Sequence, residues 1–392
     1  MREYRVIQPP RKSIRWVVAI ARILALMWAL WAALPVQAQT RLPATLDPAA
    51  LEAFFDGLIN AQRDAFRVPG ATVSVVQHGT LLFAKGYGYA NVEQRTSVAA
   101  DTTLFRVASV SKLFVWTAVM QLVEQGKLDL NADVNTYLKD FKIPPTYPQP
   151  ITLAHLMTHT PGFEEQALGT SVRSAQNLKP LGEFLATHMP ARVRPPGELT
   201  AYSNYGAALA GYIVSQVSGM SFEQYVDEHI LQPLEMRHSS FRQPLPPRLA
   251  PDIAVGYTYT DGAFHPQSFE WMQLVPAAAL SATATDMANF MIAQLQNGRF
   301  GSTRILQEAT ARAMHQQNFT NDPRVNGFAH GFAVATINDQ QLLWHGGDIM
   351  HFHSALVLLP AHNVGFFVAY NGANGMLAVL NTIRAFLDQY YR

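Results

Sequence analysis

A serine and a lysine three residues apart form a possible pair of nucleophile and base. Ser109 and Lys112 belong to the one Ser-x-x-Lys motif of the chain, where an extended pattern changes to a helical one. Because residues i and i+3 lie on the same helix face, the Lys112 amine can reach the Ser109 hydroxyl. The helix N-terminus adds positive potential and free N–H groups, which can lower the lysine pKa and stabilise an alkoxide for acyl transfer. The structural alternative is a helix-capping serine beside a solvated lysine. Chance alone predicts about 0.3 Ser-x-x-Lys motifs in this chain, so the motif by itself is weak evidence.

A Tyr-x-Asn motif at residues 202–204 follows the turn-rich segment 194–198. A tyrosine near cationic or donor groups can hold a proton poised for transfer, and Asn204 can orient Lys112 or bind a substrate carbonyl. A second Tyr-x-Asn at residues 89–91 lies in a hairpin region without a preceding Pro-Gly loop. We interpret that second copy as structural.

The segment Trp-His-Gly-Gly-Asp at residues 344–348 closes a late predicted strand. Glycines allow a substrate backbone to approach a strand edge closely. His345 could donate a hydrogen bond to Tyr202 or to substrate. The structural alternative is a histidine at a strand end before a tight turn.

Hydrophobic periodicity places these motifs between strands from both ends of the chain. Helices are expected over residues 48–67, 105–125 and about 376–391, with Gly126 as a stop signal. Strands are expected over residues 71–77, 80–87, 328–337, 341–345, 353–359 and 364–370, the first two joined by a His-Gly hairpin turn.

The predicted fold class is therefore α/β (α+β), with one antiparallel sheet built from both chain ends and flanked by terminal helices. A large, mainly helical sub-domain of about residues 105–320 is inserted. The α/β sub-domain comprises residues 39–104 and about 321–392. The two sub-domains share a long seam, where we expect a cleft and a single catalytic site.

Composition excludes several classes of function. The formal charge of the 392 residues is +1, but residues 1–38 hold six basic groups and one acid, so the rest has 23 basic and 27 acidic residues. A mildly acidic body without a Lys/Arg block argues against a nucleic-acid partner. The absence of cysteine excludes disulfides, thiolate zinc sites, cysteine nucleophiles and a lipid-modified cysteine anchor.

Residues 1–38 resemble a secretory signal peptide. A basic stretch ends at Arg22, residues 23–34 carry no polar side chain, and small residues near Ala38 suit a signal peptidase. The alternative is a retained anchor over residues 16–36, in which Arg22 would cost about 2.5–3.5 kcal/mol near the bilayer centre. We expect cleavage before Gln39 and a periplasmic or secreted protein, membrane-attached only if the leader is retained.

The three motifs, in this order, resemble the serine β-lactamase and penicillin-recognising hydrolase superfamily. The nearest branch contains class C β-lactamases, D,D-peptidases, D-aminopeptidases and related esterases. The resemblance covers about residues 48–390. Its non-catalytic matches are segments 68–70, 105–108, 126–130, 151–162, 202–211 and 280–287.

The resemblance implies a role for each matching residue. Ser109 would be the nucleophile, Lys112 and Tyr202 the pair that handles protons, and Asn204 an assistant. His345 stands in the third motif. The backbone N–H groups of Ser109 and Asp348 would form the oxyanion hole. Gly346, Gly347 and Asp348 would bind substrate, and no cofactor is implied.

The third motif departs from the family pattern at two positions. Class C β-lactamases usually carry Lys-Thr-Gly where this chain has His345, Gly346 and Gly347, which is more similar to the peptidase and aminopeptidase branches. Asp348 stands where many relatives have a small residue. If it faces inward, its carboxylate would repel a substrate carboxylate and favour neutral or amine-bearing substrates.

Two histidine pairs have spacings that could chelate a metal, at 155 and 159 and at 351 and 353. The first lacks the glutamate of a zincin motif and belongs to a structural signature of the family, so we predict no metal site. No G-x-S-x-G nucleophile elbow occurs in the sequence.

The sequence therefore predicts a periplasmic or secreted serine hydrolase that forms an acyl-enzyme through Ser109. Its partner would be a small-molecule or peptide acyl substrate with a peptide, amide, ester or β-lactam bond. Peptidase or esterase activity is favoured over dedicated β-lactamase activity. The alternative is a penicillin-binding or scaffold protein that acylates slowly or does not turn over.

Overall fold

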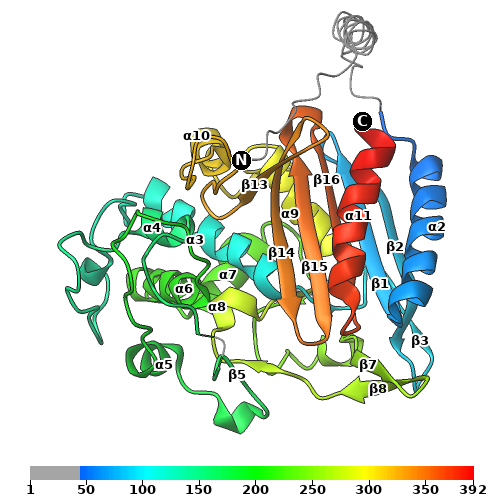
Figure 1. Ribbon diagram of the computed structural model, residues 1–392, viewed down its shortest axis with the longest axis horizontal. Helices are drawn as coiled ribbons and strands as arrows, with labels where there is room; N and C mark the ends of the chain where they lie inside the picture. Colours follow the sequence, from blue (N-terminus) through cyan, green and yellow to red (C-terminus); the bar gives the residue numbers. More distant parts are fainter. Residues whose placement is uncertain (1–44, 167) are drawn as a thin grey trace, which may run out of the picture. The chain divides into compact units, whose positions relative to one another are not determined.

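Strands from both ends of the chain form a large antiparallel sheet (Figure 1). The structure is a computed structural model that describes residues 45–166 and 168–392. Within these residues the sheet has seven strands in the order β13-β14-β15-β16-β1-β2-β3. They are β1 (Gly70–Gln77), β2 (Thr80–Asn91), β3 (Thr96–Ser97), β13 (Ala333–Ile337), β14 (Gln340–Ile349), β15 (Phe352–Leu359) and β16 (Val364–Tyr370). The pairing of β1 with β16 joins the two ends and confirms the predicted fold class.

The hairpin between β1 and β2 follows the signal in the sequence. His78 and Gly79 have φ angles of 50° and 77°. Two successive residues with positive φ are typical of a type I′ turn, whose twist matches that of the flanking strands. The predicted hairpin is therefore confirmed.

Two terminal helices, α2 (Pro48–Phe66) and α11 (Gly375–Tyr390), pack together on one face of the sheet. The ring of Phe386 lies 6.1 Å from that of Phe55 in α2 and 4.6 Å from that of Phe366 in β16. The next residue, Phe367, belongs to the apolar cluster on the other face, which α9 (Ala284–Leu295) covers. Because helices cover both faces, β1, β15 and β16 are buried along their whole length.

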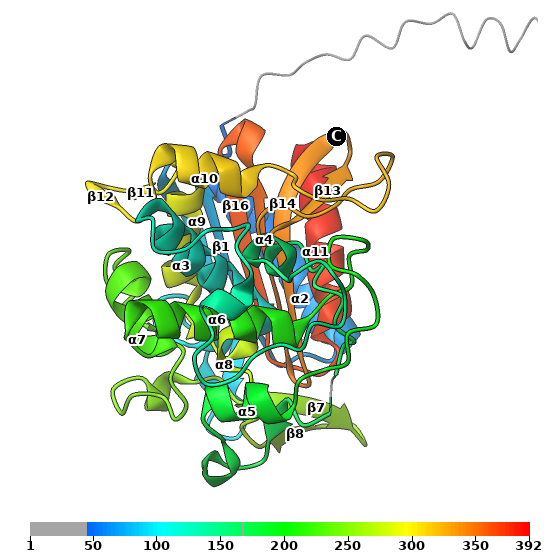
Figure 2. The same cartoon turned by 90° about the vertical axis from the view of Figure 1, so that its left-hand side faces the viewer.

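A helical region lies on the face of the sheet opposite to α2 and α11 (Figures 1 and 2). At its centre α3 is buried without interruption from Lys112 to Leu122, so it has no solvent-facing stripe there. The helices of this region are α3 (Lys112–Glu124), α4 (Leu153–Met157), α5 (Leu181–Thr187), α6 (Asn204–Ser218), α7 (Phe222–Val226), α8 (Val275–Ala278) and α10 (Glu308–His315). Its short strands are β4 (Phe105–Arg106), β5 (Ser171–Val172), β6 (Ser239–Ser240), β7 (Gly256–Thr260), β8 (Ala263–Gln267), β9 (Trp271–Met272), β10 (Ser281–Ala282), β11 (Arg299–Phe300) and β12 (Thr303–Arg304).

Residues 46–392 form one compact unit. The boundaries of the two predicted sub-domains stay a prediction, and the predicted leader at residues 1–38 lies outside the described residues. Among the residues that the structure describes, no helix is both long and apolar enough to cross a membrane.

The structure corrects three predicted elements. The helix expected over residues 105–125 begins as strand β4, which pairs with β10, and becomes α-helical only at Lys112. The strand expected at residue 328 begins at Ala333. Strand β14 does not end at His345 but runs to Ile349, so His345 lies inside the strand.

The two glycines after His345 explain the last difference. A Cβ atom on Gly347 would lie 2.1 Å from the carbonyl oxygen of Val107, immediately before the Ser-x-x-Lys turn. Gly347 therefore lets a strand, rather than a turn, pass close to that turn. A Cβ on Gly346 would meet only the end of the Trp344 ring, at 3.3 Å.

This difference predicts unequal effects of two matched substitutions. Gly347→Ala must displace backbone and should lower the free energy of unfolding by about 1–3 kcal/mol, whereas Gly346→Ala should cost less than about 1 kcal/mol. Urea unfolding of both variants measures the difference. Equal losses would show that β14 does not depend on this close approach.

Candidate active site

The Ser-x-x-Lys motif lies at the junction of β4 and α3. Ser109 belongs to a short 3-10 turn, η1 (Ala108–Ser111), and Ala108 before it has a positive φ of 49°. A non-glycine residue in this region stores strain, which persists only where its surroundings hold it. Val107 supplies such support, since its N–H donates to Leu280 and its carbonyl accepts from Ser354.

The Lys112 side chain is fully buried and meets three acceptors. Its Nζ lies 2.9 Å from Ser109 Oγ, 2.7 Å from Asn204 Oδ1 and 2.9 Å from the carbonyl oxygen of Ala277. Burial lowers the pKa of Lys112 to about 7, while the negative charge of Glu165 acts in the opposite direction. The structure therefore gives Ser109 a neighbouring amine that is partly neutral at pH 7.

Tyr202 lies against the same amine. Its ring centroid is 4.9 Å from Lys112 Nζ, and its other neighbour is the His159 ring, stacked at 4.4 Å. The residue is partly exposed, but its hydroxyl end is enclosed. Enclosure raises the pKa of Tyr202 well above its usual value, against the opposite effect of the Ser109 side chain. The hydroxyl is therefore protonated at neutral pH and can serve as a donor.

His345 is buried on β14 and uncharged. Burial and the nearby Lys112 charge lower its pKa to about 3. Its Nδ1 donates to the Gly346 carbonyl at 2.7 Å, so Nε2 carries the lone pair, and this buried atom has no partner among the described residues. The His345 and Tyr202 rings lie 6.2 Å apart without a hydrogen bond between them. In this tautomer the buried Nε2 atom is an acceptor, which differs from the expected donor role of His345.

Asp348 lies on the rim of a pocket of about 190 Å³ that Ser109 and Asn204 also line. Its side chain is 62% exposed, and its Oδ1 is 2.7 Å from Nδ1 of His353 on the neighbouring strand. Glu270 contributes a second carboxylate to the lining. Of the residues predicted for the site, Ser109, Asn204 and Asp348 line this pocket, and Lys112 and Tyr202 lie beside them. His345 lies near Tyr202, whereas Gly346 and Gly347 are not among the lining residues. The catalytic roles of the predicted residues, including the oxyanion hole, stay predictions.

Besides Glu270, two further residues of the site were not predicted from the sequence. Glu165 accepts hydrogen bonds from the backbone N–H and the Nδ2 of Asn204, at 3.0 and 2.7 Å. His159 accepts a hydrogen bond from the Ser203 N–H and supports the Tyr202 ring. Neither residue has a diagnostic spacing to the motifs. The only signal for His159 was its membership of the matched segment 151–162.

The histidine pairs considered for metal binding are engaged separately. His155 Nδ1 accepts from the Thr152 N–H in a helix cap, whereas His159 Nδ1 accepts from Ser203. His353 contacts Asp348, and His351 lines a different pocket. Residues 45–166 and 168–392 contain no group of three side chains able to hold a metal ion.

Comparison with known proteins identifies the family. A model of the beta-lactamase family matches residues 55–389. The chain belongs to the beta-lactamase family. This family belongs to the superfamily of serine β-lactamases and penicillin-binding proteins, which the resemblance of the three motifs had predicted.

Relatives of this beta-lactamase family chain are distant in sequence. Protein flp of Staphylococcus aureus (strain MW2) is 28% identical over 329 residues, which are 81% of this chain and 62% of that protein. The putative penicillin-binding protein PbpX of Bacillus subtilis is 31% identical over 227 residues, 56% of this chain and 53% of that protein. The chain thus spans about three fifths of the length of the S. aureus relative.

A solved structure shares the fold. The octameric penicillin-binding protein homologue from Pyrococcus abyssi superposes with a TM-score of 0.72, over 88% of this chain and 78% of that one. The sequence identity of 24% limits this likeness to the fold.

The charge of Glu165 makes the pH dependence testable. If neutral Lys112 is the base, kcat/KM rises with pH through about 7. Glu165→Gln keeps an acceptor for Asn204 but removes the charge that favours protonated Lys112, so this rise should move to lower pH by about 0.5 unit or more. Glu164→Gln is the matched control. A pH–rate profile that is the same for both variants would contradict the coupling of Glu165 to Lys112.

Proposed function

We propose that this chain is a serine hydrolase that forms an acyl-enzyme through Ser109 Oγ. The observation that carries the proposal is the 2.9 Å contact between Ser109 Oγ and the buried Lys112 amine, whose pKa lies near neutrality. A general base is most effective when its pKa is close to the operating pH. A lysine that only capped or solvated the helix end would keep its ordinary pKa.

The arrangement supports a two-step reaction. Neutral Lys112 accepts the Ser109 proton as Oγ attacks the substrate carbonyl carbon, and the N–H groups of Ser109 and Asp348 hold the resulting oxyanion. The proton then passes through Lys112 and the protonated Tyr202 hydroxyl to the leaving group as its bond to the carbonyl carbon breaks. A water molecule hydrolyses the Ser109 ester in the second step, releasing the acid.

Electrostatics support neutral or amine-bearing acyl donors. Asp348 and Glu270 carry negative charge at the pocket, and the third motif supplies an uncharged His345 instead of a lysine. A substrate carboxylate next to the scissile bond would therefore lack a cation and face like charge. This favours peptidase or esterase activity over dedicated β-lactamase activity. We further propose a periplasmic or secreted location, as the leader sequence indicates.

The alternative is a penicillin-binding protein that acylates slowly or does not turn over, and the similarity to the putative penicillin-binding protein PbpX supports it. A fluorescent β-lactam followed over time separates the two functions. A stable label indicates a binder, and a transient label indicates a hydrolase.

Covalent labelling tests the nucleophile. Ser109→Ala should abolish labelling by a fluorophosphonate or a fluorescent β-lactam, whereas Ser111→Ala should retain it. Ser111 Oγ accepts from the Leu280 N–H, so its loss should cost stability, about 1–3 kcal/mol, but not reactivity. Labelling that persists in Ser109→Ala would refute the assignment.

Fractionation of cells that carry the labelled protein tests the proposed location. A label found in the cytoplasm would contradict it.

The Asp348 carboxylate should act on substrate charge. Asp348→Asn removes the charge with little change in shape, so kcat/KM should rise for the anionic substrate nitrocefin relative to a neutral p-nitrophenyl ester. The side chain is mostly exposed, so we expect a gain of about threefold to tenfold, decreasing in high salt. Equal changes for both substrates would show that the carboxylate does not act on the substrate.

A further inference from the structure

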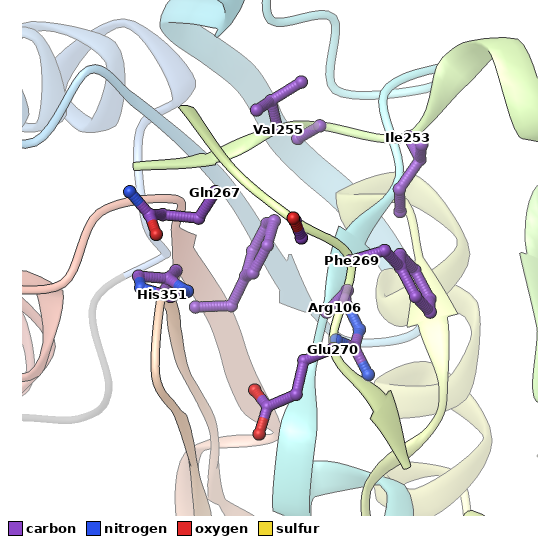
Figure 3. Close-up of a pocket in the computed structure, with 11 residues that line it drawn as sticks. Arg106, Ile253, Val255, Gln267, Phe269, Glu270 and His351 are labelled. Atoms are coloured by element: carbon purple, nitrogen blue, oxygen red, sulfur yellow. The ribbon is translucent and has the colours of Figure 1, made fainter. Parts of the chain in front are cut away.

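Figure 3 shows a second pocket, here called the Arg106 pocket. It has a volume of about 140 Å³. Its walls come from Arg106 on β4, segments 253–256 and 267–270, and residues 351–352 at the turn between β14 and β15. Glu270 lines both this pocket and the pocket that contains Ser109, so the two spaces are neighbours.

Arg106 is a buried cation, and two of its donor atoms have no hydrogen-bond partner among the described residues. The residue is 2% exposed, and its Nε and Nη2 atoms donate to none of the described residues. The Phe269 ring lies 4.3 Å from the guanidinium carbon at one wall of the pocket (Figure 3). Burial lowers the pKa of Arg106 to about 10, so the side chain remains charged at neutral pH. Burying a charge without hydrogen bonds is costly, which indicates that an acceptor belongs there.

Glu270 does not supply that acceptor. The Glu270 charge raises the pKa of Arg106, against the effect of burial. Its Oε2 atom, however, is itself buried and has no hydrogen-bond partner among the described residues. In Figure 3 the Glu270 carboxylate points away from the Arg106 guanidinium. Two residues in the walls of the pocket thus hold buried atoms without partners, donors on Arg106 and an acceptor on Glu270.

We propose that the Arg106 pocket binds a carboxylate group of the substrate, at a position away from the scissile bond. The inference rests on the proposed acyl-transfer function, which it deepens by adding a feature of the substrate. The planar guanidinium suits a carboxylate, which it can bind with two parallel hydrogen bonds. The nearby Glu270 charge favours a monoanion over a phosphate dianion.

The rest of the pocket fits a small apolar group next to the carboxylate. Ile253, Val255 and Phe352 contribute apolar side chains to its walls. A cavity of about 150 Å³ can hold benzene, and the volume here is similar. Asp348 disfavours an anion beside Ser109, whereas Arg106 attracts one into the adjoining pocket. The substrate is therefore neutral or amine-bearing at its reacting end and carries its carboxylate at a distance.

Binding without turnover tests the pocket directly. Phenylacetate is titrated calorimetrically into the Ser109→Ala chain, with phenylacetamide as the uncharged analogue. We expect phenylacetate to bind saturably at millimolar concentrations. Phenylacetamide should bind at least tenfold more weakly. Arg106→Met should weaken phenylacetate binding at least tenfold. Arg192→Met is the matched control, because Arg192 also has unpartnered Nε and Nη2 atoms and lies over the Tyr147 ring, but in another pocket.

A second variant and an inhibition experiment complete the test. If Arg106→Met does not fold, Arg106→Lys keeps the charge without the planar group and should weaken binding severalfold. No phenylacetate binding, or equal binding in the Arg106 variants and the parent, would overturn the proposal. Phenylacetate should also inhibit ester hydrolysis by the wild-type chain competitively, whereas non-competitive inhibition would mark an effector site and overturn the substrate assignment. Because calorimetry needs no acylation, failure at Arg106 is distinguishable from failure at Ser109.

Discussion

The burial of one amine, that of Lys112, organises the site. Lowering the pKa of Lys112 from 10.5 to about 7 corresponds to about 5 kcal/mol against the charged form. The same Nζ atom contacts Ser109 in η1, Asn204 in α6 and the Ala277 carbonyl in α8, so it ties three elements of the helical region together. The desolvation of Lys112 depends on the burial of the first part of α3, which is covered by neighbouring elements from Lys112 onward. The large core around α3 is therefore a condition for the chemistry as well as for stability.

The position of β14 is the second condition. Gly347 allows the strand to approach Val107, and Ser354 on β15 fixes the Val107 carbonyl by a hydrogen bond. The strained residue Ala108 and the Ser109 hydroxyl follow directly in the chain. The main sheet and the helical region thus meet at the turn that carries Ser109, and neither can shift without moving Ser109 relative to its neighbours.

The sequence was most informative where the relevant interactions are local. The spacing of Ser109 and Lys112, the His78-Gly79 hairpin turn and the terminal amphipathic helices follow from rules that span a few residues. The convergence of Tyr202 and His345 on Lys112 depends on tertiary packing, and only the family resemblance predicted it. Glu165 was not predicted because a glutamate in a loop has no spacing that reveals its partner. The full length of β14 was not predicted because two successive glycines usually indicate a turn. Here the second of them, Gly347, instead allows close contact between the strand and a backbone carbonyl.

The pairing of β1 with β16 has a consequence for how the protein acquires its structure. Ala71 lies opposite Tyr370, about 300 residues later in the chain. Because these two strands are so far apart in the chain, closing the loop between them costs conformational entropy before their hydrogen bonds and contacts can form. This cost slows folding. During synthesis β1 can pair with β2, but its other neighbour, β16, is missing until nearly the whole chain has emerged. The apolar residues of β1 and β2 are therefore open to aggregation until β16 pairs with β1, and this pairing completes the sheet late in folding.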